Sequence, residues 1–186
     1  MSTQSVKLNG IVAAAIGLVM NSLPAHAQES AEAQLLRELK EAAPTQAERV
    51  ANRLIIEWSK SGSAAMDLLL KRGRDALEVQ KFDVAIEHFT ALTDHAPDFA
   101  EGWQGLALAY FSKDMYGPAL DALEHTLALN PNHFGAMRGL GALFERVGKP
   151  DLAYKAYQKV LEVHPHDADV TEAVKRLAPQ VTGTAL

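Results

Sequence analysis

Apolar side chains recur at three- and four-residue steps along the chain after about residue 30, which is typical of amphipathic helices rather than strands. The clearest stripes are Trp103, Leu106 and Tyr110, and then Met137, Leu140 and Phe144. Turn residues follow each stripe, and Gly117-Pro118 and Lys149-Pro150 are expected to place a proline at the first position of the next helix. The pattern therefore predicts an all-α chain of short antiparallel helices.

The helical pattern repeats with a period of 34 residues, which separates Pro97 from Pro131 and Pro131 from Pro165. Small residues recur with the same period, and they would let the axes of the two helices in a pair approach to about 8–10 Å. Each closing proline cannot continue its helix and redirects the chain into the next unit. The aligned columns are Gly73, Ala107 and Gly141; Ala85, Ala119 and Ala153; and Phe89, Leu123 and Tyr157.

The middle copy of this period reads Trp103-x2-Leu106-Ala107-x2-Tyr110, Ala119-x3-Leu123 and Pro131, and it resembles the tetratricopeptide repeat. The resemblance implies a right-handed α-solenoid of antiparallel helix pairs. Its three units would span residues 66–99, 100–133 and 134–167. The first copy is the least typical, because its apolar stripe is replaced by Leu69, Arg72 and Ala76 at the positions of Trp103, Leu106 and Tyr110.

Helical segments flank the three units on both sides. Residues 28–65 read as a degenerate N-terminal helix pair that caps the stack, with Thr45-x-x-Glu48 as a capping box. Residues 168–186 read as a capping helix and tail, with Val170, Val174 and Leu177 turned inward and Pro179 after the helix. Such end elements seal the last apolar face of a solenoid.

Composition excludes several kinds of chemistry. The 186 residues contain no cysteine, so disulfides, thiolate metal sites and cysteine nucleophiles are absent. With 18 basic and 23 acidic side chains the net charge is −5, which disfavours a nucleic-acid partner.

The first 27 residues have the order of a secretory signal peptide. Lys7 is their only charged residue besides the amino terminus, an apolar run follows from Ile11 to Met20, and Ala25 and Ala27 fit a cleavage site before Gln28. An uncleaved anchor is the alternative, although the run is shorter than the roughly 20 residues that span a bilayer. Removing Lys7 with this segment leaves 17 basic and 23 acidic side chains, net −6. We expect a periplasmic protein with no stable membrane insertion after cleavage.

The sequence contains no motif for catalysis or for a cofactor. We therefore expect a protein that is not an enzyme and has no cofactor. A remote alternative is metal binding by the histidines of two neighbouring turns, His133, His164 and His166. The simpler interpretation is that polar turns tolerate histidine.

In the tetratricopeptide repeat family, the first helices build a concave wall that holds a partner peptide. The resemblance assigns to this groove Asp67, Leu70, Arg74, Leu77, Glu101, Gln104, Leu108, Phe111, Gly135, Arg138, Ala142 and Glu145. If its apolar members are exposed, they form a strip flanked by Arg74 and Arg138 that suits hydrophobic anchors and an acidic group. They could equally contact the capping helices or the neighbouring first helices. The lysine, asparagine and arginine clamp of the chaperone-binding members is not carried over, because the corresponding positions are Leu70, Arg74, Gly105, Gly135 and Gly139.

The sequence is compatible with two functions. The first is a scaffold or adaptor in the periplasm that binds a partner peptide or helix in its groove. The second is a structural subunit of a larger envelope complex that uses the convex face or the N-terminal helices around Trp58. Thermal stabilisation of the isolated chain by a peptide favours the first. Self-association in the absence of a partner favours the second.

Overall fold

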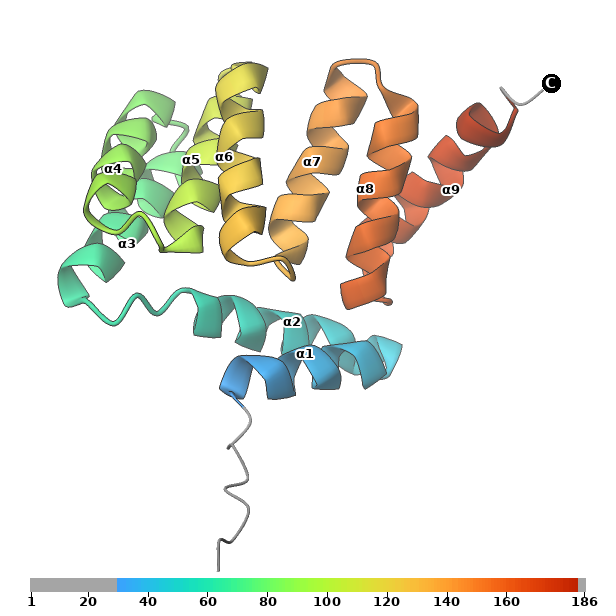
Figure 1. Ribbon diagram of the computed structural model, residues 1–186, viewed down its shortest axis with the longest axis horizontal. Helices are drawn as coiled ribbons and strands as arrows, with labels where there is room; N and C mark the ends of the chain where they lie inside the picture. Colours follow the sequence, from blue (N-terminus) through green and yellow to red (C-terminus); the bar gives the residue numbers. More distant parts are fainter. Residues whose placement is uncertain (1–29, 184–186) are drawn as a thin grey trace, which may run out of the picture.

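The computed structural model describes residues 30–183, and this part of the chain consists of helices joined by short turns (Figure 1). The segment assigned to export, residues 1–27, lies outside the described residues. None of the described helices is long and apolar enough to cross a membrane. The helices are α1 (Ala31–Glu41), α2 (Pro44–Trp58), α3 (Ala64–Glu78), α4 (Phe82–His95), α5 (Ala100–Ser112), α6 (Tyr116–Leu129), α7 (Phe134–Arg146), α8 (Pro150–Val163) and α9 (Ala168–Thr182).

Three antiparallel pairs, α3–α4, α5–α6 and α7–α8, stack side by side, and this confirms the predicted all-α solenoid. The first helices form one layer, because α5 packs against both α3 and α7. The second helices α4, α6 and α8 form the other layer. The concave surface of the stack therefore consists of α3, α5 and α7.

The columns of small residues are the contact points between helices. Ala85, Ala119 and Ala153 have no exposed surface. The fully buried ring of Phe89 lies between two glycines, and a Cβ atom would come within 2.5 Å of the ring at Gly73 and within 2.3 Å of it at Gly105. Only glycine at both positions leaves room for the ring, so the first two repeats pack around Phe89.

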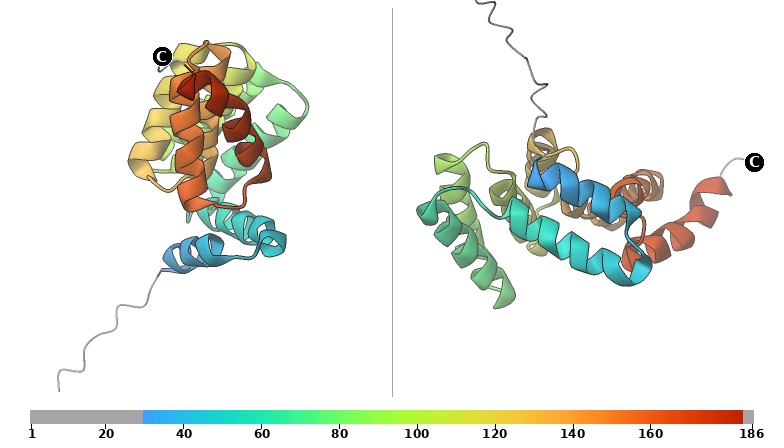
Figure 2. Two further views of the ribbon diagram at one scale, coloured as in Figure 1. Left: turned by 90° about the vertical axis from the view of Figure 1, so that its right-hand side faces the viewer. Right: turned by 90° about the horizontal axis from the view of Figure 1, so that it is seen from below.

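The N-terminal helix pair, α1 and α2, does not extend the stack ahead of the first repeat. It lies across the ends of the repeats, with α1 and α2 side by side beneath them (Figures 1 and 2). The described residues form two hydrophobic cores. One core joins the first two repeats with part of α7, and the other joins the N-terminal helix pair with the third repeat and α9.

Apolar side chains from both partners explain this position. Leu39 and Leu54 of the N-terminal helix pair are fully buried, and they share a core with Phe134, Val160 and other residues of the third repeat. The segment between α2 and α3 includes Gly62 with a positive φ of 78°, a conformation that glycine adopts at little cost. This turn separates the pair from α3.

Some helix ends differ from the prediction. The capping box at Thr45 is wrong, because α2 begins at Pro44 and its N-cap, Ala43, has no side-chain hydrogen bond. Pro150 does begin α8, whereas Pro118 is the third residue of α6. Both places suit proline, since the first N–H groups of a helix have no partner within it. Helix α9 continues through Pro179 to Thr182.

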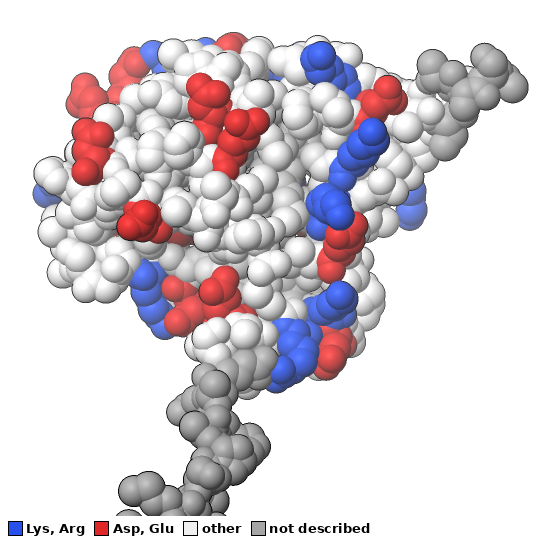
Figure 3. Space-filling view, in the orientation of Figure 1, with Lys and Arg blue, Asp and Glu red and all other residues white. Residues whose placement is uncertain are grey.

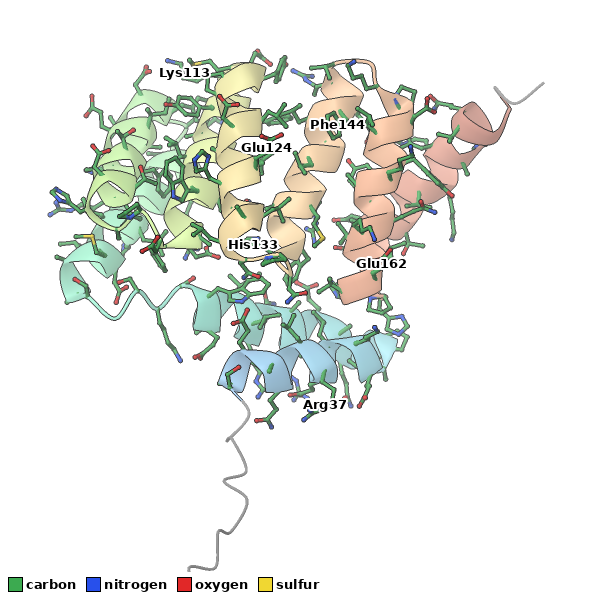
Figure 4. The ribbon with its side chains drawn as sticks, in the orientation of Figure 1. Arg37, Lys113, Glu124, His133, Phe144 and Glu162 are labelled. Carbon is green, nitrogen blue, oxygen red and sulfur yellow. The ribbon has the colours of Figure 1, made fainter. Side chains whose placement is uncertain are left out.

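Trp58, at the end of α2, joins the N-terminal helix pair to the repeats. Its ring stacks on His133 with centroids 4.7 Å apart and packs against Phe134 at 5.3 Å. Its Nε1 donates a hydrogen bond of 2.8 Å to Glu32 Oε1. His133 is the N-cap of α7 and lies at the lower end of the repeats, where the turn before α7 meets α2 (Figure 4).

Gly105→Ala is expected to destabilise the fold, because Gly73 closes the other side of the Phe89 ring and leaves it no space to move. Such overpacking typically costs about 1–3 kcal/mol, which corresponds to a Tm lower by about 3–10 °C for a chain of this size. Gly117→Ala is the control, since a Cβ there has nothing within 4 Å. Thermal unfolding followed by circular dichroism measures both, and equal Tm values would contradict this account of the repeat contact.

Trp58→Ala is expected to loosen the N-terminal helix pair, because the ring contacts with His133 and Phe134 are lost. The cost should be about 2–3 kcal/mol, less than for a fully buried tryptophan because Trp58 keeps part of its surface exposed. Tryptic cleavage at Arg53 and Lys60 should become faster. Ile56→Ala, at a side chain that is 62% exposed on the same helix, should leave the cleavage rate almost unchanged.

Candidate functional site

The concave surface contains an apolar pocket between α5 and α7, with a volume of about 350 Å³. We call it the apolar pocket. Leu108 is 49% exposed at this site, a large value for an apolar side chain on a packed helix. The pocket is lined by Gln104, Ala107, Leu108, Phe111, Leu123, Gly135, Arg138, Gly139 and Ala142.

The pocket exists because α7 presents small residues opposite large ones on α5. Ala142 occupies the repeat position of Leu108, one period later. A Cβ atom at Gly139 would lie 2.9 Å from the Leu123 side chain, so glycine there lets α7 approach the second repeat closely. The large apolar side chains of α5 therefore face a hollow rather than a matching layer.

A second pocket, of about 400 Å³, adjoins the first and shares Gly135 and Arg138 with it. We call it the α2 pocket, because α2 forms one of its walls. Its other walls are the start of α7 and the turn between α8 and α9. The lining residues are Glu48, Ala51, Ile55, Phe134, Gly135, Arg138, His164, Asp167, Ala168 and Asp169.

The groove arginine Arg74 is engaged within the protein. Its guanidinium donates to Glu101, which is 4% exposed, and to Ser59 Oγ at 2.9 Å. The other oxygen of Glu101 lies 2.9 Å from His133 Nε2. Since His133 Nδ1 accepts a hydrogen bond from the Ala136 N–H, the proton is on Nε2, which donates to Glu101. The Glu101 carboxylate therefore offsets the charge of Arg74, whose side chain remains 40% exposed.

Arg138 is paired in a similar way, with Asp167. Asp167 is the N-cap of α9 and accepts from the Val170 N–H at 3.0 Å. Burial opposes ionisation of Asp167, but the nearby His164 ring, the Val170 N–H and Arg138 together lower its pKa below the ordinary value. The carboxylate therefore stays charged and holds Arg138. The Arg138 Nε atom, in contrast, is buried without a hydrogen-bond partner.

Glu145, which the sequence assigns to the groove, instead connects α7 to α9 through an ion pair with Arg176. Arg176 of α9 donates to both of its oxygens, at 2.6 and 3.0 Å, and this is the main reason that the pKa of Glu145 is lowered. The Tyr157 hydroxyl donates to the same carboxylate at 2.9 Å. Burial, and then this hydrogen bond to Glu145, raise the pKa of Tyr157.

The structure thus divides the predicted groove residues into two groups. Gln104, Leu108, Phe111 and Arg138 line one pocket, together with Gly135 and Ala142. The remaining predicted residues belong to the protein's own contacts. Leu70 is only 3% exposed, Leu77 packs on the core of the first two repeats, and Asp67 accepts two hydrogen bonds from Ser61 that lower its pKa.

Sequence reasoning missed the α2 pocket. Glu48 and Ile55 reach it only because the N-terminal helix pair lies across the repeats, and no repeat column signals that position. The sequence places His164 in a polar turn and offers it as a remote candidate for a metal ligand, but it does not predict that the ring is buried: His164 is 2% exposed and neither ring nitrogen has a hydrogen-bond partner. Within residues 30–183, no group of three or more histidine, aspartate or glutamate side chains is arranged to hold a metal ion.

Known proteins share this repeat and this fold. The family profile described as Tetratricopeptide repeat matches residues 70–117. A solved structure described as the first TPR of Spaghetti (RPAP3) bound to HSP90 peptide SRMEEVD has a TM-score of 0.60, 25% identity, and covers 63% of this chain and 93% of its own. A crystal structure of MamA protein has a TM-score of 0.58 and covers 82% of this chain and 81% of its own, and at 23% identity it shows the fold alone.

The sequence relationship extends over most of the chain. A TPR repeat-containing protein of Rhizobium etli is 33% identical over 151 residues, which are 81% of this chain and 74% of that protein. The similarity to this TPR relative agrees with the period of 34 residues. It also agrees with the glycine and alanine contacts between paired helices. The chain belongs to the tetratricopeptide repeat family.

Proposed function

We propose that this protein is a non-enzymatic interaction module that binds an extended segment of a partner protein in its concave groove. The observation that carries the proposal is the apolar pocket between α5 and α7, where Leu108 and Phe111 face a hollow of about 350 Å³. A cavity of this size accepts an apolar side chain as an anchor. Family membership supports the same class of function, since the similar RPAP3 domain is described as bound to an HSP90 peptide.

Two unpaired polar atoms just beneath the surface of the apolar pocket support a peptide as the ligand. Gln104 Oε1 and Arg138 Nε are buried without a hydrogen-bond partner, one an acceptor and the other a donor. Both residues line the apolar pocket. A peptide bond offers the complementary N–H and C=O groups, so an extended segment would satisfy both atoms while its side chain fills the pocket.

The groove chemistry argues against an acidic ligand as the main partner. An acidic group needs a free cation, and Arg74 and Arg138 are each paired with a buried carboxylate, Glu101 and Asp167. The peptide in the RPAP3 complex, SRMEEVD, is rich in carboxylates. We infer that this chain selects its partner through apolar anchors instead.

We also propose that the protein acts in the periplasm as a scaffold or adaptor. The order of residues 1–27 supports this setting, as a charged start, an apolar run and small residues before Gln28 are typical of exported proteins.

Ala142→Leu is expected to block the apolar pocket, because the larger side chain would occupy the space opposite Leu108. Peptides selected from a random phage-displayed library on the chain from Gln28 onward should lose at least about tenfold in affinity for this variant. Fluorescence anisotropy with the labelled peptides gives the dissociation constants, and thermal unfolding checks that the variant is folded.

Leu152→Ala on α8 is the matched control, since Leu152 is 40% exposed and lines no part of the apolar pocket. It should leave peptide affinity unchanged. If Ala142→Leu left peptide affinity unchanged, or if both variants weakened binding equally, the binding site would not be the apolar pocket and the proposal would be overturned.

Export makes a separate prediction. When the full chain is expressed in a Gram-negative host, the periplasmic fraction should contain a shortened protein whose first residue is Gln28, as determined by amino-terminal sequencing. Ala27→Arg should block cleavage, because the site requires a small residue. An intact amino terminus on a cytoplasmic protein would contradict the periplasmic assignment.

A further inference from the structure

The α2 pocket differs in charge from the apolar pocket beside it. Three carboxylates and one guanidinium line it, from Glu48, Asp167, Asp169 and Arg138. Arg138 is paired with Asp167, which leaves Glu48 and Asp169 without an ion-pair partner among the described residues. The pocket therefore has an excess of negative charge that the protein's own side chains do not neutralise.

A buried histidine in the same wall packs on the ring of Phe134, with centroids 5.6 Å apart, but has no hydrogen-bond partner. His164 is 2% exposed and lines the α2 pocket, yet both ring nitrogens lack a hydrogen-bond partner. The nearest carboxylate, Asp167, is 3.6 Å from Nδ1, which is beyond hydrogen-bond distance. Burying an unpaired polar group opposes folding, so an unpaired ring at a pocket wall points to a ligand that supplies the missing partner.

We propose that the α2 pocket binds the side chain of an arginine or lysine that belongs to the same partner segment as the apolar anchor. This inference rests on the proposed function and adds the second element of recognition. The unpaired carboxylates Glu48 and Asp169 attract the cationic group, and the His164 ring accepts a hydrogen bond from it. Arginine suits the site best, because its guanidinium has several N–H donors for separate acceptors.

The apolar part of the wall fits the aliphatic stem of such a side chain. Ile55 is 36% exposed, and Phe134 and Ala51 form the adjoining surface. Arginine and lysine side chains commonly lay their methylene groups on apolar surface while the charged end meets polar groups. Since the two pockets share Gly135 and Arg138, one extended segment could fill both.

The first experiment tests the site without a peptide. N-acetyl-arginine amide and its neutral isostere N-acetyl-citrulline amide are titrated into the chain from Gln28 onward, and the ring signals of His164 are followed by NMR. The arginine compound should shift these signals in a saturable way, and the citrulline compound should bind at least about tenfold more weakly. Equal binding of the two compounds, or no shift with either, would overturn the inference.

Variants of Glu48 and Asp169 test whether the preference for arginine depends on these two carboxylates. Glu48→Gln with Asp169→Asn should abolish the preference for arginine over citrulline. The control is Asp121→Asn with Glu124→Gln, which removes the same charge from exposed positions on α6, where acidic side chains are visible on the face in Figure 3. An equal loss in both double variants would show a general charge effect and no site.

Peptides from the library separate this inference from the proposed function. They should contain a basic residue at a fixed offset from the apolar anchor, and its replacement by glutamine should weaken binding about tenfold to the wild type but not to the Glu48→Gln, Asp169→Asn variant. If Ala142→Leu removes binding while the acidic variant binds as the wild type does, the groove function holds and the cation site is wrong. If the arginine compound binds as expected but Ala142→Leu has no effect on peptides, the groove function is wrong and the cation site holds.

Discussion

A carboxylate buried at the start of α5 fixes the positions of several helices at once. The two oxygens of Glu101 accept hydrogen bonds from Arg74 of α3 and from His133 at the start of α7. Because a buried carboxylate without partners is very unfavourable, movement of any one of these helices would be costly. Arg74 also binds Ser59, and Trp58 stacks on His133, so the end of α2 is held at the same place.

This arrangement decides what the groove can recognise. The arginines that the sequence places on the concave wall belong to internal ion pairs, so they position helices and their charge is offset by Glu101 and Asp167. The apolar surface of the pocket consists mainly of Leu108, Phe111 and the small residues of α7. The N-terminal helix pair places α2 next to the apolar pocket. There it forms one wall of the α2 pocket, which carboxylates line in part. In the function that we propose, specificity arises where a repeated element meets a unique one.

The repeats were predictable from the sequence because their packing rules are local and recur. Paired helices come so close that only small residues fit between them. Examples are the glycine opposite Phe89 and the buried residues Ala85, Ala119 and Ala153, and their regular spacing makes them recognisable in the sequence. The position of the N-terminal helix pair depends on contacts that occur once, such as Trp58 on His133, and a single occurrence leaves no pattern. The pairing of Arg74 with Glu101 also occurs only once, so no repeat column reveals it. Arg74 lies at a groove position of the family, but in this protein it holds α3 to α5.

The N-terminal helix pair also limits how the chain can evolve. An open solenoid can gain or lose a unit at little cost, because each unit contacts only its neighbours. Here α2 is joined by the chain to the first repeat and by its buried side chains to the third. Duplicating or deleting the middle repeat would move Phe134 and its neighbours by a whole unit away from Leu39 and Leu54. The number of repeats is therefore fixed by the distance that one helix pair can span.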